Sequence, residues 1–288
     1  MSPAIRPVPA RAIDAILTLA FAEDCPRGDV TADSLLNPTV QATAEVVARE
    51  PGVLSGTTVF ARAMSMIDPD IDTTVLLEDG QSFAAGQSVL RVSGPAAAIL
   101  TAERVALNLL QRMSAIATAT AQLVQAVAHT RAKIADTRKT TPGLRVLERY
   151  AVRCGGGVNH RDNLSEAFMA KDNHLAVLGS GEQLTAGLRR VRASLGHTTA
   201  MEVEVDHIDQ IPAVLDAGVD VIMLDNFTPE QIPAALELID SRAVVEASGN
   251  VNLQTVAALA ETGVDVISSG AITHSVQAID FGLDMVIS

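Results

Sequence analysis

The chain has 288 residues, 48% hydrophobic and 19% charged, a composition that excludes an intrinsically disordered protein. Its formal net charge is −13 and its isoelectric point is about 4.8, which argues against nucleic acid or an anionic membrane as a partner, because both attract basic proteins. With no tryptophan, one tyrosine and 2% aromatic residues in all, the chain is also poor in the side chains on which single-stranded nucleic acid stacks.

The first 130 residues predict a mixed α+β region. A helix over about 10–22 precedes strand-like segments, which turn signals separate, at 43–50, 52–56, 73–80 and 87–94. A long helical stretch over about 96–128 follows. Within it, residues 113–130 carry no Asp, Glu, Lys or Arg, but several threonines and two glutamines favour a buried helix over a membrane span.

Cysteine is sparse. Cys25 and Cys154 lie far apart and without the spacing of metal ligands. Such sparse use fits a reducing compartment, and we expect a cytoplasmic protein. The first residues also lack the apolar run of a secretory signal.

Beyond residue 130, apolar strand-like segments alternate with amphipathic helices. Six such segments occur, at 133–139, 167–174, 201–206, 219–226, 243–250 and 264–271. This alternation implies parallel strands joined by right-handed crossovers, and the short repeat favours a βα-barrel. In such barrels the chemistry lies at the carboxyl ends of the strands, and here each segment ends in polar residues.

The boundaries of these regions predict a domain organisation. We expect an α+β domain at 1–114, a βα-barrel at 115–272 and a C-terminal segment at 273–288 that packs back on the first domain. Within the barrel, Thr228-Pro229-Glu230-Gln231 predicts the start of a helix, with threonine as the N-cap and glutamine completing a capping box.

Positive charge is concentrated between residues 131 and 171, which hold nine of the 21 lysines and arginines. An acidic protein that gathers cations at strand ends suits a small polyanion, since arginine binds carboxylate or phosphate through two parallel hydrogen bonds. We assign four cations at strand ends or in loops to this role: Arg138, Lys139, Arg161 and Lys171. Four other residues fall at helical spacing and favour a solvated helix face: Arg145, Glu148, Arg149 and Arg153.

Three glycine-containing loops stand out in this part of the sequence. Gly155-Gly156-Gly157, shortly before His160 and Arg161, would permit close approach of a ligand to the backbone. Ser248-Gly249-Asn250 and Ser269-Gly270-Ala271 close the last two strands, each ahead of a helix, and predict a phosphate site.

Two carboxylates, Glu204 and Asp225, end the intervening strands. Facing phosphate loops, they suggest Mg²⁺ held between protein and substrate, directly or through water. The alternative is that they cap neighbouring helices, where acidic residues are favoured in any case.

Longer motifs carry a family resemblance. They are LTAER (100–104) with Leu107-Asn108, DTRKTTPGLRVLERYAVRCGGGVNHR (136–161), KDNH (171–174), EVEVD (202–206), LDN (224–226), EASGN (246–250) and SSGAITHS (268–275). Together they closely resemble the quinolinate phosphoribosyltransferases over nearly the whole chain. Ala115 stands where that family often has glycine.

The resemblance implies a barrel of the type II phosphoribosyltransferase kind with an N-terminal α+β sandwich domain. It implies transfer of the phosphoribosyl group of 5-phosphoribosyl-1-diphosphate to quinolinate with loss of CO₂, which gives nicotinate mononucleotide and pyrophosphate for NAD biosynthesis. It further implies Mg²⁺ and a homodimer in which Arg104 reaches into the neighbouring subunit's site.

The matched motifs also imply roles for individual residues. The quinolinate dicarboxylate would be surrounded by Arg104, Arg138, His160, Arg161 and Lys171, with Thr137 also at the substrate. Lys139 would lie near the diphosphate, and Glu204 and Asp225 near Mg²⁺ and the ribose hydroxyls. The 5′-phosphate would be bound by Ser248, Gly249, Asn250, Ser269, Gly270 and Ala271. The residues assigned to catalysis are Glu204, Asp225, Lys139 and Lys171.

Other interpretations use the same residues differently. An aldolase-like barrel would use Lys171 as a Schiff-base amine. A lipoyl-type carrier around Glu78-Asp79-Gly80 requires an acceptor lysine, and none precedes Lys133. A paralogous phosphoribosyltransferase acting on another pyridine or another acceptor remains the main alternative, because a fold does not fix a substrate.

Overall fold

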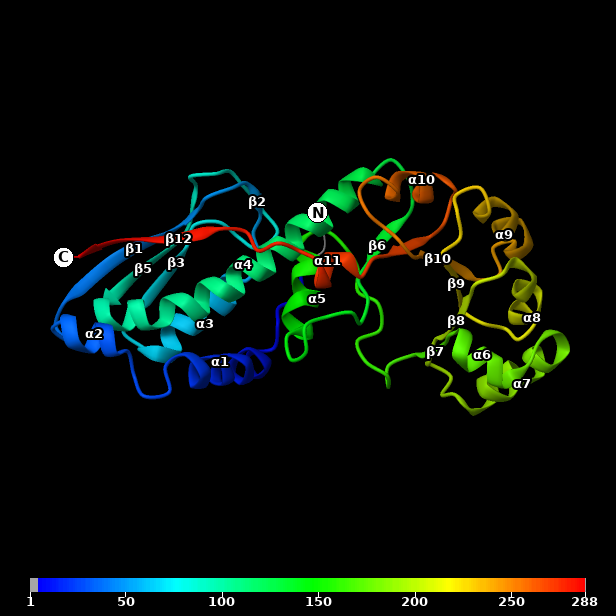
Figure 1. Ribbon diagram of the computed structural model, residues 1–288, viewed down its shortest axis with the longest axis horizontal. Coiled ribbons are helices and arrows are strands. Elements are labelled where there is room, and N and C mark those ends of the chain that lie inside the picture. Colours follow the sequence, from blue (N-terminus) through cyan, green and yellow to red (C-terminus); the bar gives the residue numbers. More distant parts are fainter. Residues whose placement is uncertain (1–4, 288) are drawn as a thin grey trace. The chain divides into compact units, whose positions relative to one another are not determined.

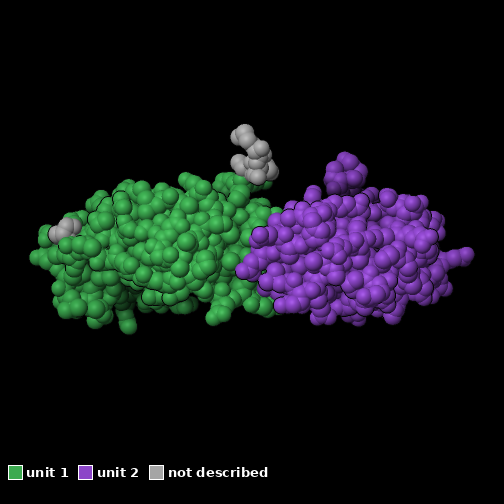
Figure 2. Space-filling view, turned by 90° about the horizontal axis from the view of Figure 1, so that it is seen from above, with its two compact units in different colours: residues 1–121, 140–156, 272–288 green, residues 122–139, 157–271 purple. Residues whose placement is uncertain are grey.

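The computed structural model describes residues 5–287 and divides into two compact units, which Figure 2 colours separately. Unit 1 consists of residues 1–121, 140–156 and 272–288, and unit 2 of residues 122–139 and 157–271. Residues 140–156 therefore fall in unit 1, although in the chain they lie between two segments of unit 2.

Unit 1 contains a four-stranded antiparallel sheet in the order β12-β1-β5-β3 (Figure 1). These strands are β1 (Gln41–Ala48), β3 (Asp72–Val75), β5 (Ser88–Pro95) and β12 (Phe281–Ile287). Every second residue of β1 from Ala42 to Ala48 is buried, because alternate side chains of a strand point to the same face. A short ladder joins β2 (Gly52–Val53) to β4 (Ser82–Phe83).

Helices α1 to α4 of unit 1 lie along one face of this sheet in Figure 1, and α5 also belongs to unit 1. They include α1 (Ala10–Asp24), α2 (Val30–Leu35), α3 (Thr57–Ile67), α5 (Arg145–Cys154) and most of α4 (Ala96–Ala126). Asp79 caps α3 by accepting the N–H groups of Gly56 and Thr57, and the Tyr150 hydroxyl donates to the same carboxylate over 2.7 Å. The turn at Glu78-Asp79-Gly80 thus serves to anchor a helix. Among the described residues, no helix is long and apolar enough to cross a membrane.

Unit 2 contains a six-stranded parallel sheet in the order β6-β11-β10-β9-β8-β7. The strands are β6 (Lys133–Ala135), β7 (Phe168–Ala170), β8 (Met201–Val205), β9 (Val221–Asp225), β10 (Val244–Ser248) and β11 (Val266–Ser268). All six lie within the predicted segments, and the prediction of a barrel-like parallel sheet with helices is confirmed. The ladder has two ends, at β6 and β7.

The connections of unit 2 carry short helices outside the strands (Figure 1). They are α6 (Asp172–Leu178), α7 (Gly181–Ser194), the 3₁₀ turn η1 (Ile208–Gln210), α8 (Ile211–Leu215), α9 (Ile232–Ile239) and α10 (Val256–Glu261). After β11 comes α11 (Ala271–His274), which belongs to unit 1 from Ile272 onward. The predicted N-cap at Thr228 is three residues early, since Gln231 is the N-cap of α9, which begins at Ile232. The capping contact nevertheless forms, because the Gln231 side chain accepts the Thr228 N–H at 2.9 Å.

The predicted solvated face of α5 is wrong. Glu148 is 1% exposed and pairs with Arg112 of α4, whose guanidinium donates two hydrogen bonds to it at 2.9 and 3.0 Å. Arg145, Arg149 and Arg153 are half-buried. The partner lies 36 residues away, so helical spacing within α5 could not reveal it.

Gly155, the first residue of the glycine run after α5, has a different role from the predicted close approach of a ligand. A Cβ on Gly155 would overlap the carbonyl oxygen of Ala117 in α4, so this glycine allows two helices to approach each other. Its need for glycine comes from helix packing rather than from a ligand.

Candidate active site

A cavity of about 360 Å³ lies at the carboxyl ends of the unit 2 strands. It is lined by Thr137, Arg138, Lys139, His160, Arg161, Met169, Lys171, Glu204, Met223, Asp225, Ser248 and Ser268. Most of the residues predicted at the site are in this lining. We refer to this cavity as the carboxyl-end pocket.

Strand geometry brings these residues together. Lys171 directly follows β7, while Asp225 and Ser248 are the last residues of β9 and β10. Glu204 of β8 pairs in register with Met223 of β9, and Asp225 lies two residues after Met223 on β9. Because side chains of a strand alternate between faces, Glu204 and Asp225 point to the same side of the sheet.

Arg161 carries an incompletely satisfied guanidinium. One of its terminal nitrogens donates to the carbonyl of Ala167 at 2.9 Å, but its buried Nε has no hydrogen-bond partner in the described part of the chain. Burial lowers the pKa of Arg161, and the positive charge of Arg138 lowers it further, while Glu202 opposes the shift. The positive charge of Arg138 near the incompletely hydrogen-bonded guanidinium of Arg161 favours an anionic ligand.

The two carboxylates of the pocket are held by neighbouring side chains. Lys171 Nζ donates to Glu204 Oε2, and the Asn226 side-chain amide donates to Asp225 Oδ2 over 2.7 Å. Lys171 is itself placed at the start of α6, where its main-chain N–H donates to His174 Nδ1. The cationic Lys171 and the carboxylates of Glu204 and Asp225 therefore lie at the carboxyl ends of the neighbouring strands β7, β8 and β9.

The loop that carries His160 is held by hydrogen bonds to Asp136, which directly follows β6. This fully buried carboxylate accepts the His160 N–H at 2.7 Å and the Asn159 side-chain amide at 2.6 Å. Val158 also pairs with Ala135 at the end of β6. The loop is thus fixed against the first strand of the sheet.

Sequence reasoning missed two residues, Glu202 and Glu246. Both are buried carboxylates, and together with the His160 ring they form a group whose polar atoms lie within 4.8 Å of one another. Burial raises the pKa of Glu246 to about 7, with the negative charge of Glu202 acting in the same direction. Burial lowers the pKa of His160, but the negative charges of Glu202, Glu246 and Asp136 outweigh it, so the pKa lies above the usual value. A signal was present, since glutamates alternate in the otherwise apolar Met201–Val205.

Of the two predicted phosphate loops, only the first, Ser248-Gly249-Asn250, lines a cavity at the carboxyl ends of the strands. Ser248 lines the carboxyl-end pocket, while Gly249 and Asn250 line an adjoining cavity of about 310 Å³ together with Asn226. Gly249 has φ +101°, and a Cβ there would overlap the Asn226 side chain, so this position requires glycine. The helix expected after Asn250 begins only at Val256.

The second loop does not form part of either cavity. Ser269 is buried, and its N–H donates to the carbonyl of Ala135 at 3.0 Å, which ties the end of β11 to β6. Gly270 and Ala271 are not among the residues that line the two cavities. The roles assigned to Ser269, Gly270 and Ala271 therefore remain predictions.

Comparison with known proteins assigns this site to a family. Residues 29–114 match the family model of the quinolinate phosphoribosyl transferase N-terminal domain, and residues 116–284 match that of the C-terminal domain. The chain belongs to the quinolinate phosphoribosyltransferase family. The fold and family expected from the motifs are confirmed.

Relatives of the family are similar over almost their whole length. The chain is 40% identical over 273 residues to a probable carboxylating nicotinate-nucleotide pyrophosphorylase of Bacillus subtilis, covering 95% of this chain and 93% of the relative. It is 43% identical to the Mycobacterium leprae nicotinate-nucleotide pyrophosphorylase, with 92% and 94% covered. The solved structure of Streptococcus pyogenes NadC matches with a TM-score of 0.93 and 40% identity, covering 98% of this chain and 99% of that one.

One residue expected at the quinolinate phosphoribosyltransferase site lies in unit 1. Arg104 is on α4, its side chain is 60% exposed, and its guanidinium lies 3.7 Å from Glu103. An exposed cation with one weak ion pair remains available to other groups. Its predicted reach into a neighbouring subunit stays a prediction.

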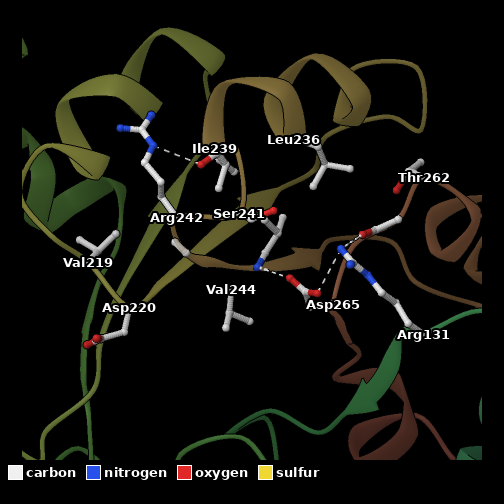
Figure 3. A pocket seen from close by; sticks show the side chains of 13 residues that line it. Arg131, Val219, Asp220, Leu236, Ile239, Ser241, Arg242, Val244, Thr262 and Asp265 are labelled. Carbon is white, nitrogen blue, oxygen red and sulfur yellow. Dashed lines mark hydrogen bonds and ion pairs between the residues drawn. The ribbon is translucent and has the colours of Figure 1, made fainter.

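A larger cavity lies at the opposite, amino ends of the same strands (Figure 3). Its volume is about 920 Å³, and its cations are engaged by the protein. Arg131 donates to the carbonyl of Gly263 at 2.6 Å and pairs with Asp265, as Figure 3 shows for the ion pair. Arg242 donates to the carbonyls of Leu238 and Ile239 at the end of α9. We call this the amino-end cavity, and its cations serve the fold.

Proposed function

We propose that this chain catalyses the transfer of the 5-phosphoribosyl group from 5-phosphoribosyl-1-diphosphate to the ring nitrogen of quinolinate. The products are pyrophosphate, CO₂ and nicotinate mononucleotide, a precursor of NAD. The observation that carries the proposal is the carboxyl-end pocket, in which Arg138, Arg161 and Lys171 gather around a space bordered by Glu204 and Asp225. Family membership supports the same reaction.

The cations suit a planar dicarboxylic acid. Quinolinate carries two adjacent carboxylates, and arginine donates to a carboxylate through two parallel hydrogen bonds. The partly desolvated guanidinium of Arg161, whose pKa burial lowers, gains most from an anion that completes its hydrogen bonds. Binding of the diacid would fix the ring nitrogen toward the ribose and so lower the entropic barrier to transfer.

Transfer of the phosphoribosyl group needs no covalent nucleophile from the protein. As the bond from the ribose C1 to pyrophosphate breaks, positive charge develops on the ribose ring, as in other glycosyl transfers. Glu204 and Asp225 can stabilise that charge from the carboxyl ends of β8 and β9. The ring nitrogen then supplies the electron pair of the new bond, and Lys139 lies on the pocket wall, where it can neutralise the departing diphosphate.

Loss of CO₂ follows from the charge on the new pyridinium ring. Once its nitrogen is alkylated, the ring can accept the electron pair left when the adjacent carbon–carboxylate bond breaks, and a proton then takes the place of CO₂. The cations must therefore orient the diacid without overstabilising the carboxylate that leaves. This requirement favours partly satisfied cations over fully paired ones.

The residues present fit a magnesium ion. Glu204 and Asp225 offer carboxylate oxygens from neighbouring strands on one face of the sheet, and hard oxygen ligands are those that Mg²⁺ prefers. When bound, Mg²⁺ would neutralise negative charge on the diphosphate. We propose Glu204 and Asp225 as its holders, directly or through water.

The assembly and the compartment are also part of the proposal. We propose a homodimer in which Arg104 of one subunit completes the site of the other, supported by the exposed position of this side chain. We further propose a cytoplasmic location, supported by the sparse use of cysteine.

A second candidate is a paralogous enzyme that transfers phosphoribosyl to another pyridine acid. The pocket residues alone would serve any small aromatic carboxylate. The aldolase alternative is less favoured, because Lys171 Nζ donates to the Glu204 carboxylate, an ion pair that favours the ammonium form over the free amine that a Schiff base requires.

Mass spectrometry separates these candidates. Purified protein is incubated with 5-phosphoribosyl-1-diphosphate and Mg²⁺, with quinolinate in one tube and nicotinate in another. We expect nicotinate mononucleotide from quinolinate alone. Product from nicotinate alone, or no product from folded protein, would contradict the proposal and leave the paralogous enzyme as the better account.

A further inference from the structure

Beneath the carboxyl-end pocket lies a second layer of charged side chains. Glu202 and Glu246 each stand two residues before a pocket residue on the same strand, Glu204 on β8 and Ser248 on β10. A spacing of two keeps the side chains on one face of a strand and places the earlier residue deeper among the strands. Glu202 is 5% and Glu246 is 4% exposed, so the substrate-facing layer rests on a buried carboxylate layer.

The His160 ring joins these two layers. Its Nδ1 accepts the main-chain N–H of Arg161 at 2.7 Å. Its Nε2 lies 3.0 Å from Glu202 Oε2 and 3.7 Å from Glu246 Oε1. Both ring nitrogens therefore face protein groups.

These contacts define the tautomer of the ring. A nitrogen that accepts an N–H carries no proton, so Nδ1 is the unprotonated atom. Carboxylates accept hydrogen bonds, so Nε2 carries the proton and donates it to Glu202. In this arrangement neither ring nitrogen is left for a substrate carboxylate, in contrast to the role expected for His160 from the family resemblance.

Arg161 is the residue that this ring holds. Its main-chain N–H is fixed by His160 Nδ1, one terminal nitrogen is fixed by the carbonyl of Ala167, and its Nε is buried without a hydrogen-bond partner among residues 5–287. Arg161 is thus held at two points, its main-chain N–H and one terminal nitrogen of its guanidinium. A small change in the backbone at Arg161 would shift the rest of the fork relative to a bound carboxylate.

We propose that His160 is a positioning residue, which sets Arg161 through Nδ1 and is itself held by Glu202 and Glu246 through Nε2. The inference rests on the proposed function, because Arg161 is taken to bind quinolinate. It adds two residues, Glu202 and Glu246, to the machinery of the site. It also assigns His160 to the support of the site rather than to direct substrate binding.

Two nearly isosteric variants separate the two contacts of the ring, because each keeps one contact and removes the other. His160→Asn places an amide oxygen near the position of Nδ1 and keeps an acceptor for the Arg161 N–H, but it loses the donor to Glu202. His160→Gln extends an amide toward Glu202 and keeps that donor, but it loses the acceptor. We expect His160→Gln to raise the KM for quinolinate by roughly threefold to tenfold, the equivalent of one lost hydrogen bond, and His160→Asn to raise it less. The KM for 5-phosphoribosyl-1-diphosphate should change little in either variant.

Nitrogen NMR of protein labelled in its histidine rings reads the tautomer without relying on turnover. On the basic side of the ring's titration, we expect His160 to show a proton on Nε2 and none on Nδ1, and to keep this pattern when quinolinate is added. The His160→Gln variant identifies the signals that belong to this ring.

Several results would overturn the inference. They are a proton on Nδ1, a ring that gains a second proton when quinolinate binds, or equal increases in the quinolinate KM for both variants. Failure of the proposed function would look different, since wild-type protein would then form no nicotinate mononucleotide while the spectrum still reported the ring.

Discussion

The two ends of the six-stranded sheet both carry a cavity lined with arginine, but the charged groups at the two ends are in different states. In the amino-end cavity, Arg131 and Arg242 donate to main-chain carbonyls, and Arg131 also pairs with Asp265. In the carboxyl-end pocket, Arg161 has a buried Nε that no group in the described residues accepts from, and burial lowers its pKa. The amino-end cavity is the larger, at about 920 Å³ against about 360 Å³.

Chain direction accounts for this contrast. In βα units the helices end near the amino ends of the following strands, where their last carbonyls lack partners, and Arg242 satisfies those of α9. At the carboxyl-end pocket, Arg161 also donates to a main-chain carbonyl, that of Ala167, but its buried Nε has no partner among the described residues. Unsatisfied buried donors cost free energy, and a ligand that accepts from them recovers it. The state of the polar groups, more than the volume, therefore indicates where a ligand binds.

The largest effect is expected from removing both carboxylates of the carboxyl-end pocket. Glu204→Gln with Asp225→Asn should lower kcat by about 10³-fold or more, because the charge that develops on the ribose loses its counter-charge. Quinolinate binding should stay within about threefold of wild type, since these groups face the ribose side of the site. Stopped assays for nicotinate mononucleotide and calorimetric titration with quinolinate measure the two quantities. Equal loss of both would indicate a folding defect.

A smaller but still large effect is expected from the cations. Arg161→Ala or Arg138→Ala should cost about 3 kcal/mol in kcat/KM, roughly a 10²-fold loss, because a desolvated charge partner of the substrate is removed. Arg161→Lys should recover part of the loss, since it restores the charge but not the planar fork. Steady-state kinetics with quinolinate as the varied substrate measure this. Values within threefold of wild type would mean that these side chains form a solvated face.

The amino-end cavity provides the matched comparison. Arg131→Ala and Arg242→Ala remove cations from the same sheet, but we expect kcat/KM to stay within about twofold of wild type. The free energy of unfolding should fall by at most about 1 kcal/mol for each, because the lost hydrogen bonds are largely exposed. Kinetics and urea denaturation test this pair. A loss of activity as large as that of Arg161→Ala would break the contrast between the two ends.

Local sequence pattern was sufficient to predict the parallel sheet and much of the pocket. Apolar runs that end in polar residues mark the strands, and parallel pairing then brings Arg138, Lys171, Glu204, Asp225 and Ser248 to one edge. This works because the position of a residue at a strand end follows from the chain itself. No long-range contact has to be known in advance.

Contacts between distant segments could not be predicted in this way. The burial of Glu148 depends on Arg112 in another helix, and the need for glycine at position 155 depends on the carbonyl of Ala117. The support of His160 by Glu202 and Glu246 requires knowing which strands are neighbours and in what register. The alternation of glutamates in β8 hinted at an inward-facing acid, but its partner lies 42 residues away.

The smallest effect concerns the buried acid beneath the pocket. Burial and the charge of Glu202 raise the pKa of Glu246 to about 7, above that of an unfolded chain, so the folded state holds this proton more tightly. The stability linked to this proton is present at low pH and is lost as the pH rises toward 7. Glu246→Gln should therefore flatten the fall in unfolding free energy between about pH 5 and about pH 8, measured by urea denaturation. A slope in Glu246→Gln equal to that of wild type would mean that Glu246 does not keep its proton in the folded state, and that burial beneath the carboxyl-end pocket does not hold this acid neutral.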